Sequence, residues 1–327
     1  MSVLVTGGTG VIGAMVVRKL VEKGIEPVVV ARHADLSFLK DVKSKITFVQ
    51  GDVLDFEKVK KIIRTQGIKR IIHASALMPG ETQNDPIKGF NVNSFGTLNL
   101  LEAGRRFGIE RFVYTSAKGV YSPIRGEYDH PTYKPIDENY PREMQMGMYG
   151  ATKLCGEIIG FQYQRDFNVE FVALRFGMTY GPGKLLRHGP LAVHSKIIEN
   201  SMLKKAVLIP QGAEQKDDMI YTKDCANAVV LATFAKGLTS NVFNIGSGVG
   251  KTLGDFSNAV KKILPAADIE IGPGLNYLGI VHNVYSIFDI TRARKELKFN
   301  PEFDLEKSVQ DYVETMRLLN IEPVYTP

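Results

Sequence analysis

The sequence predicts an α/β fold: a doubly wound parallel sheet of Rossmann-like type, with a smaller, discontinuous C-terminal substrate domain. Three observations predict it. A glycine-rich turn separates an apolar run, Val3 to Val5, from a helical pattern that begins at Val11. Further short apolar runs alternate with helical patterns, an order typical of a parallel sheet covered by helices. Tyr149 and Lys153 stand four residues apart in one of the later helical patterns.

Length and composition limit the class of protein. With 327 residues the chain is long enough for one large domain or two, and 44% apolar with 23% charged residues is an ordinary globular composition. The net charge of +6 comes from scattered lysines and arginines, so we expect no nucleic-acid partner. No apolar run approaches the roughly 18 residues that a membrane helix needs, and the first strand leaves no room for a signal peptide. We therefore expect no membrane partner and a cytoplasmic location.

The cysteines and the potential metal ligands suggest no metal site. Cys155 and Cys225 both fall within predicted helices and have no partner at metal-ligand spacing. We expect both to be free, buried thiols.

The glycine-rich turn is the first predicted binding element. Gly7 lets the chain turn sharply, Gly10 has no Cβ to obstruct a pyrophosphate, and Gly13 lets the following helix pack closely on the strand. The helix N-terminus adds free N–H groups and the positive end of its dipole. Glycine-rich turns also occur as plain loops, but the flanking strand and helix favour a dinucleotide site.

The second predicted strand, residues 26 to 30, bears on cofactor choice. NAD-binding folds usually have an acidic residue at its end, whereas a nearby arginine accommodates the 2′-phosphate of NADP. Here Ala31 stands at that position and Arg32 follows. We predict that NADP is favoured over NAD; the alternative is that Arg32 is an exposed loop residue.

The next strands end in residues suited to ligand contact. The third, residues 46 to 53, ends in Gly-Asp-Val with Asp52, and the fourth, residues 70 to 76, ends in small residues. Open parallel sheets bind ligands at the carboxyl ends of their strands. His73 lies within the fourth strand, and we interpret it as a packed core residue.

Tyr149 and Lys153 are the predicted chemical pair. Four residues along a helix bring two side chains to one face. A phenol that titrates near about 10 must exchange a proton near neutral pH, and a neighbouring ammonium favours the phenolate.

Taken in order, Thr6-Gly-Gly-Thr-Gly-Val-Ile-Gly13, the Asp52 turn, the helix from Asn91 and Tyr149-Gly-Ala-Thr-Lys153 resemble the extended short-chain dehydrogenase/reductase family of NAD(P)-dependent epimerases and dehydratases. The resemblance covers nearly the whole chain. It implies that Tyr149 exchanges the proton of a substrate hydroxyl during hydride transfer, while Lys153 lowers the tyrosine pKa and binds the nicotinamide ribose. It also implies a homodimer through the helices that begin near Asn91 and Tyr149.

The resemblance implies two sets of site residues. The catalytic set is Tyr149, Lys153 and Ser116. The cofactor-binding set is Gly7, Thr9, Gly10, Val11, Ile12, Gly13, Arg32, Asp52, Val53, Ala74, Ser75, Ala76, Asn93, Thr115, Tyr149, Lys153 and Phe176.

The fifth predicted strand departs from the family. The catalytic hydroxyl of the family precedes a valine by three residues, and that position is Ala117. Three possibilities remain open: Ser116 or Thr115 substitutes after a backbone shift, another polar group such as Lys118 polarises the substrate, or no hydroxyl is used. We favour Ser116. Dehydration is less expected, because dehydratases have acidic residues where this chain has Lys118 and Gly119.

The C-terminal half leaves the substrate open. The arginine that contacts a nucleotide diphosphate in many relatives aligns with Asp217, and residues 274 to 282 lack the second such arginine. A free sugar, a sugar acid or another small hydroxy compound therefore competes with a sugar nucleotide. Epimerase and net dehydrogenase are both possible, and a non-catalytic dinucleotide sensor is the alternative of another class. The long segment from 122 to about 146 is expected to be functional or a lid.

We predict a dinucleotide-binding domain of residues 1–176 plus about 221–248. Residues 177–220 plus 249–327 are predicted to form the substrate-binding domain.

Overall fold

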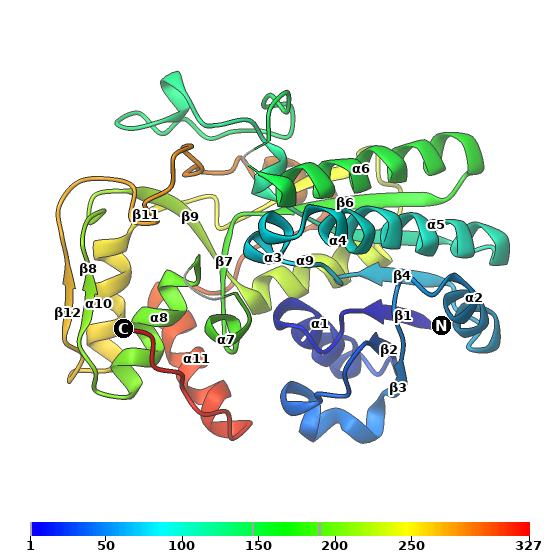
Figure 1. Cartoon of the computed structure of the whole chain (residues 1–327), viewed down its shortest axis with the longest axis horizontal. Coiled ribbons are helices and arrows are strands. Elements are labelled where there is room, and N and C mark those ends of the chain that lie inside the picture. The colour runs from blue at the N-terminus through cyan, green and yellow to red at the C-terminus, as the bar shows by residue number, and fades with distance from the viewer. Residues whose placement is uncertain (1, 146, 189–190) are drawn as a thin grey trace.

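The computed structural model describes residues 2–145, 147–188 and 191–327, and its centre is a seven-stranded parallel sheet (Figure 1). The strand order is β10-β6-β5-β4-β1-β2-β3. The strands are β1 (Val3–Thr6), β2 (Val28–Ala31), β3 (Thr47–Gln50), β4 (Arg70–His73), β5 (Arg111–Ala117), β6 (Glu170–Phe176) and β10 (Val242–Ile245). The order reverses between β1 and β4, and this confirms the predicted Rossmann-like fold.

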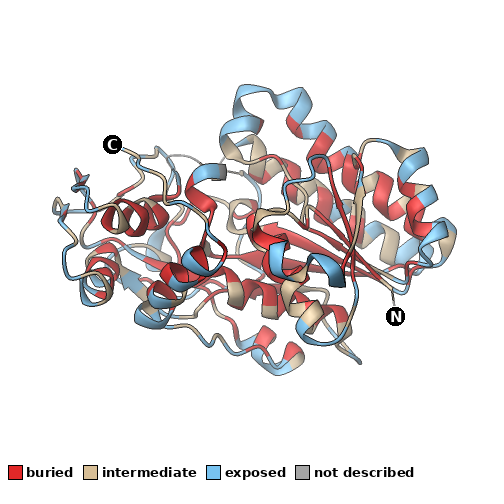
Figure 2. Ribbon diagram, turned by 90° about the horizontal axis from the view of Figure 1, so that it is seen from below, coloured by how far each residue is buried: buried red, intermediate tan, exposed pale blue. Residues whose placement is uncertain are grey.

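Both faces of the sheet are buried, because successive side chains of a strand point to opposite faces. In β5, Val113 belongs to the core on one face, while Phe112 and Tyr114 belong to the core on the other. The first face is covered by α1 (Val11–Glu22) and α9 (Thr222–Phe234), and the second by α2 (Phe56–Thr65), α5 (Gly96–Phe107) and α6 (Met148–Phe167). Figure 2 shows the strands as a buried layer between these helices.

Short elements connect β4 to α5. The helices α3 (Pro79–Asn84) and α4 (Pro86–Phe90) run into a π-helical turn at Asn91–Phe95 before α5 begins. The long helix that was predicted to begin at Asn91 is therefore the later part of a continuous helical segment, which begins with α4 and ends with α5.

In the described residues of the C-terminal half, two small sheets and, besides α9, four α-helices are added to the seven-stranded sheet. One sheet has the order β11-β9-β7, from Gly250–Thr252, Lys216–Tyr221 and Met178–Tyr180, and the other pairs β12 (Ile269–Ile271) with β8 (Val207–Ile209). The helices are α7 (Lys184–His188), α8 (Val193–Met202), α10 (Leu253–Ile263) and α11 (Leu305–Leu318). Helices α8, α10 and α11 share an aromatic-rich third core with β7, β8, β9 and β12. The predicted domain boundaries stay a prediction.

The described residues contain no helix whose length and apolar character would suffice to cross a membrane. Among the same residues, no group of three or more histidine, cysteine or acidic side chains is arranged to hold a metal ion. Cys225 is buried as expected, whereas Cys155 is only half-buried.

Candidate active site

The glycine-rich turn between β1 and α1 is closed so tightly that side chains would not fit. Gly7 has a φ of +66°, and a Cβ there would lie 2.7 Å from the backbone nitrogen of Ser75. A Cβ on Gly13 would lie 2.1 Å from the carbonyl oxygen of Gly7. Gly10 is the N-cap of α1 and has no side-chain cap. The turn thus leaves the first N–H groups of α1 open to an anionic ligand, as a dinucleotide pyrophosphate requires.

A small cavity of about 20 Å³ lies at the carboxyl ends of β2 and β3. Several residues of the predicted cofactor set line it, namely Arg32, Asp52, Val53, Ser75 and Ala76. Arg32 is exposed, and Asp52 accepts a hydrogen bond from the backbone N–H of Leu54 at 2.9 Å. The structure thus brings five residues of the predicted cofactor set together around one cavity.

The main cleft has a volume of about 710 Å³ and lies beyond the carboxyl ends of β5 and β6. Its lining brings together segments far apart in the sequence: the start of α1, α3, the end of β5, the start of α6, α7 and residues 278–284. Five of the predicted site residues are in this lining, namely Val11, Ile12, Ser116, Tyr149 and Phe176. The cleft therefore joins the glycine-rich turn to the predicted tyrosine.

Tyr149 lies in the first turn of α6 and is half-buried in the cleft wall. The loop after β5 packs directly on this turn, because a Cβ on Gly150 would lie 2.0 Å from the carbonyl oxygen of Gly119. Burial raises the pKa of Tyr149 above its usual range. The predicted lowering of this pKa by Lys153 is not seen in the chain by itself.

Lys153 lies one helical turn later but does not line the cleft. Its side chain is 2% exposed, and its Nζ donates to the carbonyl oxygen of Thr115 at 2.7 Å. Burial lowers the pKa of Lys153 to about 7, against a smaller opposing effect of Glu157. Desolvation is thus the main cause of the pKa shift at both Tyr149 and Lys153, because it favours the neutral form of each side chain.

The hydroxyls at the end of β5 are engaged away from the cleft. Ser116 donates to the Glu157 carboxylate at 2.6 Å, and Thr115 donates to the carbonyl oxygen of His73 at 3.0 Å. Glu157 is fully buried and paired with Arg175. These contacts do not supply the catalytic hydroxyl expected of Ser116, whose role stays a prediction.

Asn93 and His73 are buried and do not line the cleft. Asn93 accepts from the Leu77 N–H at 2.7 Å and donates to its carbonyl oxygen at 3.0 Å, which fixes the segment after β4. His73 is fully buried between the hydroxyls of Thr6 and Thr97, and burial lowers its pKa to about 3. His73 is therefore the packed core residue that the sequence suggested.

Two lysines outside the predicted catalytic and cofactor-binding sets also line the cleft, and Lys118 was named from the sequence only as one possible polarising group. Lys118 lines the cleft, and its Nζ lies 2.7 Å from Oδ1 of Asp217. Lys184 also lines the cleft; burial, together with the charge of Lys118, lowers its pKa to about 8. Lys118 and Asp217 are 99 positions apart, so no local pattern could have predicted this pair.

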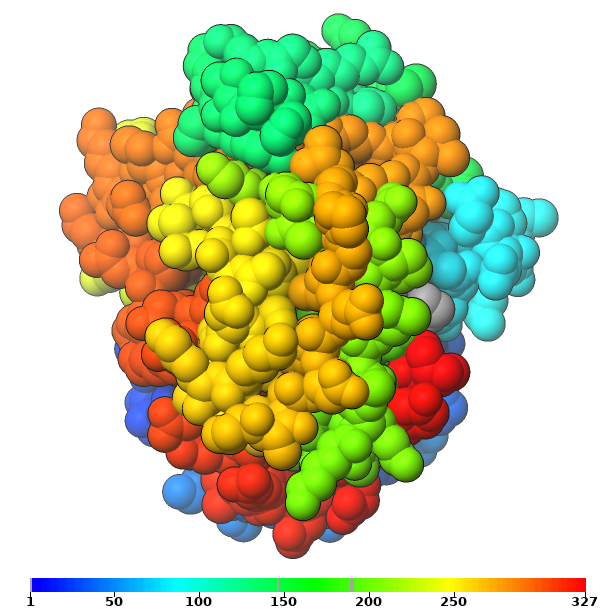
Figure 3. Space-filling view, turned by 90° about the vertical axis from the view of Figure 1, so that its left-hand side faces the viewer, coloured from blue at the N-terminus to red at the C-terminus, as the bar shows by residue number. Residues whose placement is uncertain are grey.

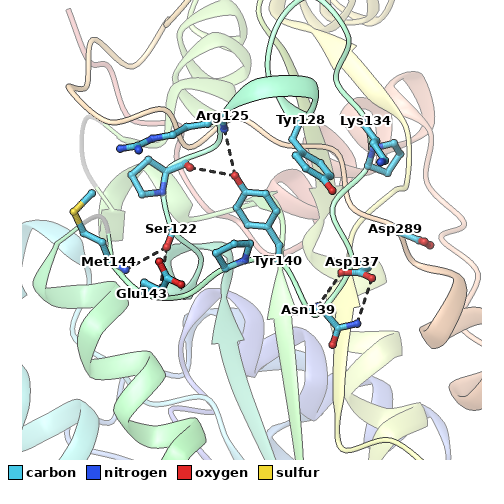
Figure 4. A pocket seen from close by; sticks show the side chains of 13 residues that line it. Ser122, Arg125, Tyr128, Lys134, Asp137, Asn139, Tyr140, Glu143, Met144 and Asp289 are labelled. Atoms are coloured by element: carbon cyan, nitrogen blue, oxygen red, sulfur yellow. Dashed lines mark hydrogen bonds between the residues drawn. The ribbon is translucent and has the colours of Figure 1, made fainter.

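A second cavity of about 960 Å³ lies within the loop of residues 122–144 (Figure 4). The loop projects at one end of the molecule, beside residues from the C-terminal half (Figure 3). Tyr140 links two parts of this loop, because its hydroxyl accepts from the Arg125 N–H and donates to the Pro123 carbonyl oxygen. No described residue lines both this cavity and the main cleft. The lid role predicted for this loop stays a prediction.

Curated proteins with similar sequences span nearly the whole chain. A UDP-glucose 4-epimerase of Lacticaseibacillus casei is 31% identical over 279 residues, covering 80% of this chain and 81% of that protein. A putative UDP-glucose 4-epimerase of Methanocaldococcus jannaschii is 28% identical over 316 residues, covering 96% of this chain and 98% of that protein.

Solved structures agree. A UDP-glucose 4-epimerase of Thermotoga maritima, crystallised with UDP-glucose, has a TM-score of 0.83 and 27% identity, covering 97% of this chain and 99% of that one. The Thermus thermophilus UDP-glucose 4-epimerase, in complex with NAD, has a TM-score of 0.79 and 26% identity, with the same coverage. The model of the NAD dependent epimerase/dehydratase family matches residues 3–246. The chain is therefore an enzyme of the NAD dependent epimerase/dehydratase family, as the resemblance of its motifs implied.

Proposed function

We propose that this enzyme catalyses the reversible oxidation of a hydroxyl-bearing carbon in a sugar or sugar-like compound, with epimerisation as the net reaction. The observation that supports this most is the position of Tyr149. It is half-buried in the same cleft wall as Val11 and Ile12 of the glycine-rich turn. A proton-exchanging group thus lies beside the place where the dinucleotide would bind.

The residues present fit a dinucleotide. The open N-terminus of α1 and the glycines would hold the pyrophosphate, and the cavity around Asp52 would hold the adenosine end. When bound, the dinucleotide supplies the nicotinamide carbon that accepts or returns the hydride. Tyr149 takes the proton of the substrate hydroxyl and returns it in the reverse step. Lys153 is set behind the cleft wall in the chain by itself, and we assign its N–H groups besides the one that bonds Thr115 to the nicotinamide ribose when the dinucleotide is bound.

The relatives suggest sugar nucleotides as the first substrate class to test. A second candidate is a free sugar or sugar acid that undergoes net oxidation or reduction. Asp217 favours it, because a buried carboxylate stands where many relatives have a phosphate-binding arginine. Paired with Lys118, this carboxylate offers no positive charge to a diphosphate, unlike an arginine.

A turnover panel tests the proposal. UDP-glucose, UDP-galactose, free sugars and sugar acids are each incubated with NAD or NADP. Epimerisation gives a new sugar without accumulation of reduced cofactor, whereas a dehydrogenase accumulates reduced cofactor. Cofactor binding without turnover of any compound would contradict the proposal.

We also propose that the enzyme favours NADP over NAD. Arg32 lines the cavity at the end of β2, and we assign it to the 2′-phosphate of NADP.

We further propose a homodimer. Large apolar side chains on α4, the following turn and α6 support it: Ile87, Phe90, Phe95 and Ile158 are 77%, 49%, 47% and 59% exposed. The cytoplasmic location stays a prediction from the sequence.

A further inference from the structure

At the end of β5, Ala117 stands where the family resemblance places a catalytic hydroxyl, so this hydroxyl is missing. It lines the main cleft next to Tyr149 but has no group that donates a hydrogen bond to a substrate oxygen. The neighbouring hydroxyls are committed elsewhere, since Ser116 donates to buried Glu157 and Thr115 to the backbone of β4. Turning the Ser116 hydroxyl toward the cleft would remove one donor from the Glu157 carboxylate, which is fully buried.

Lys118 occupies the cleft at the adjoining position. A 3-10 turn at Lys118–Val120 begins directly after Ala117, and Gly119 in that turn contacts the first turn of α6. The Lys118 side chain is 12% exposed and lines the same cleft as Tyr149. The loop therefore places a lysine, rather than a hydroxyl, next to Ala117 in the wall of the cleft that Tyr149 also lines.

Asp217 fixes the direction of this ammonium. Its carboxylate is fully buried and lies 2.7 and 3.0 Å from Lys118 Nζ. The same carboxylate also accepts from the Tyr277 hydroxyl at 3.2 Å and the Ser286 N–H at 3.2 Å. Since an ammonium has three N–H groups and a carboxylate occupies at most two, at least one N–H of Lys118 remains for another acceptor.

We propose that Lys118, held by Asp217, donates a hydrogen bond to the reacting oxygen of the substrate and so replaces the hydroxyl missing at position 117. This inference rests on the proposed function. In the oxidation direction, the substrate C–H bond breaks with hydride leaving to the nicotinamide, and the O–H proton passes to the phenolate form of Tyr149. The C–O bond becomes C=O, while Lys118 keeps its protons and stabilises the charge on oxygen.

The test separates catalysis from the ion pair's structural role. The double variant Lys118→Met with Asp217→Asn removes both charges, so no unpaired buried charge remains. Turnover is measured with UDP-galactose, D-galactose and D-galactonate as probes, reduced-cofactor binding by fluorescence titration, and folding by thermal melting. We expect kcat to fall about 100-fold while KM, cofactor affinity and melting temperature change little.

Restoring the hydroxyl gives a second readout. Ala117→Ser added to the double variant should raise kcat again by at least about 10-fold, because it supplies the missing donor. A folded double variant with wild-type kcat, or no recovery on adding the serine, overturns the role of Lys118.

The remaining outcomes are also decisive. If the double variant does not fold, Lys118→Met alone replaces it; this side chain has no N–H donor, while Asp217 still accepts from Tyr277 and Ser286, and wild-type kcat would overturn the inference. A wild-type enzyme that turns over none of the three probes overturns the proposed function on these substrates and the role of Lys118 together. Wild-type turnover that survives loss of the lysine overturns Lys118 alone.

Discussion

The side-chain nitrogen of Lys153 lies 5.8 Å from the centre of the Tyr149 ring. Both side chains project from one face of α6, but Lys153 donates to the Thr115 carbonyl oxygen and lies 4.7 Å from the centre of the Tyr114 ring. Lys153 is therefore set back from the cleft that Tyr149 lines, and burial raises the tyrosine pKa and lowers the lysine pKa. A positive charge beside the tyrosine is needed to favour its phenolate.

Tyr149→Phe should abolish most turnover and preserve cofactor binding. The substitution removes only the hydroxyl that exchanges the proton, and we expect kcat to fall by about 10² to 10⁴. Steady-state assays and fluorescence titration with reduced cofactor measure the two effects. Tyr163→Phe is the matched control, because Tyr163 is also on α6 but its hydroxyl contacts Glu102. Turnover of Tyr149→Phe within twofold of the wild type would remove the mechanism.

Lys153→Met should remove turnover and stabilise the fold. The lysine pKa is 10.5 in the reference state and about 7 in the fold, so the unfolded chain binds the proton more tightly. Wild-type stability therefore rises with pH between about 7 and 10.5, and the cost of burying the lysine is largest below pH 7.

Each pKa unit corresponds to about 1.4 kcal/mol, so the gain from methionine should be a few kcal/mol at most. Thermal melts at pH 6.5 and pH 9 check this prediction. The melting temperature of Lys153→Met should exceed that of the wild type by more at pH 6.5. A gain that grows with pH would contradict the assigned cause.

Ser116→Ala distinguishes a catalytic serine from a structural one. The hydroxyl donates to Glu157, which keeps its ion pair with Arg175 after the change. We expect a loss of about 1 kcal/mol in the free energy of unfolding, and kcat should fall by less than about 10-fold. Denaturant unfolding and steady-state kinetics measure both. Ser201→Ala, which removes another buried hydroxyl on α8, is the control. If kcat instead fell by about 100-fold or more, the catalytic role first predicted for Ser116 would be supported.

Arg32→Ala should weaken NADP binding by about 10-fold, the effect of one charge-assisted hydrogen bond. NAD binding should change little, because NAD has no 2′-phosphate. Calorimetric titration with each cofactor measures the difference. Arg165→Ala removes an exposed arginine at the far end of α6 and should change neither affinity. Equal changes for both cofactors would show that Arg32 does not discriminate between them.

Ile158→Glu should favour the monomer. The side chain is 59% exposed on α6, and a charge there would be desolvated in a dimer interface. Sedimentation velocity over a range of protein concentrations measures the distribution. Leu208→Glu, at a 62% exposed position on β8, is the control and should leave the distribution unchanged. A wild-type chain that stays monomeric at all concentrations would contradict the dimer.

Much of the fold was predictable because local rules specify it. Strands β1 and β5 stand where apolar runs predicted them, and the turn at Gly7 follows from a backbone conformation that favours glycine. Burial of His73 also agreed with the sequence pattern. The short elements between β4 and α5, and the half-burial of Cys155, were not predicted, because packing rather than periodicity decides them.

The sequence by itself determined the strands, the glycine turn and the placement of Tyr149 and Lys153 on one helical face, because each depends on residues a few positions apart. Only the tertiary structure decided where the Ser116 hydroxyl points and that Lys118 meets Asp217. Those partners come from α6 and β9, far along the chain. A polar side chain removed from water takes the partner that the packing of distant elements brings to it, so no local pattern encodes that choice.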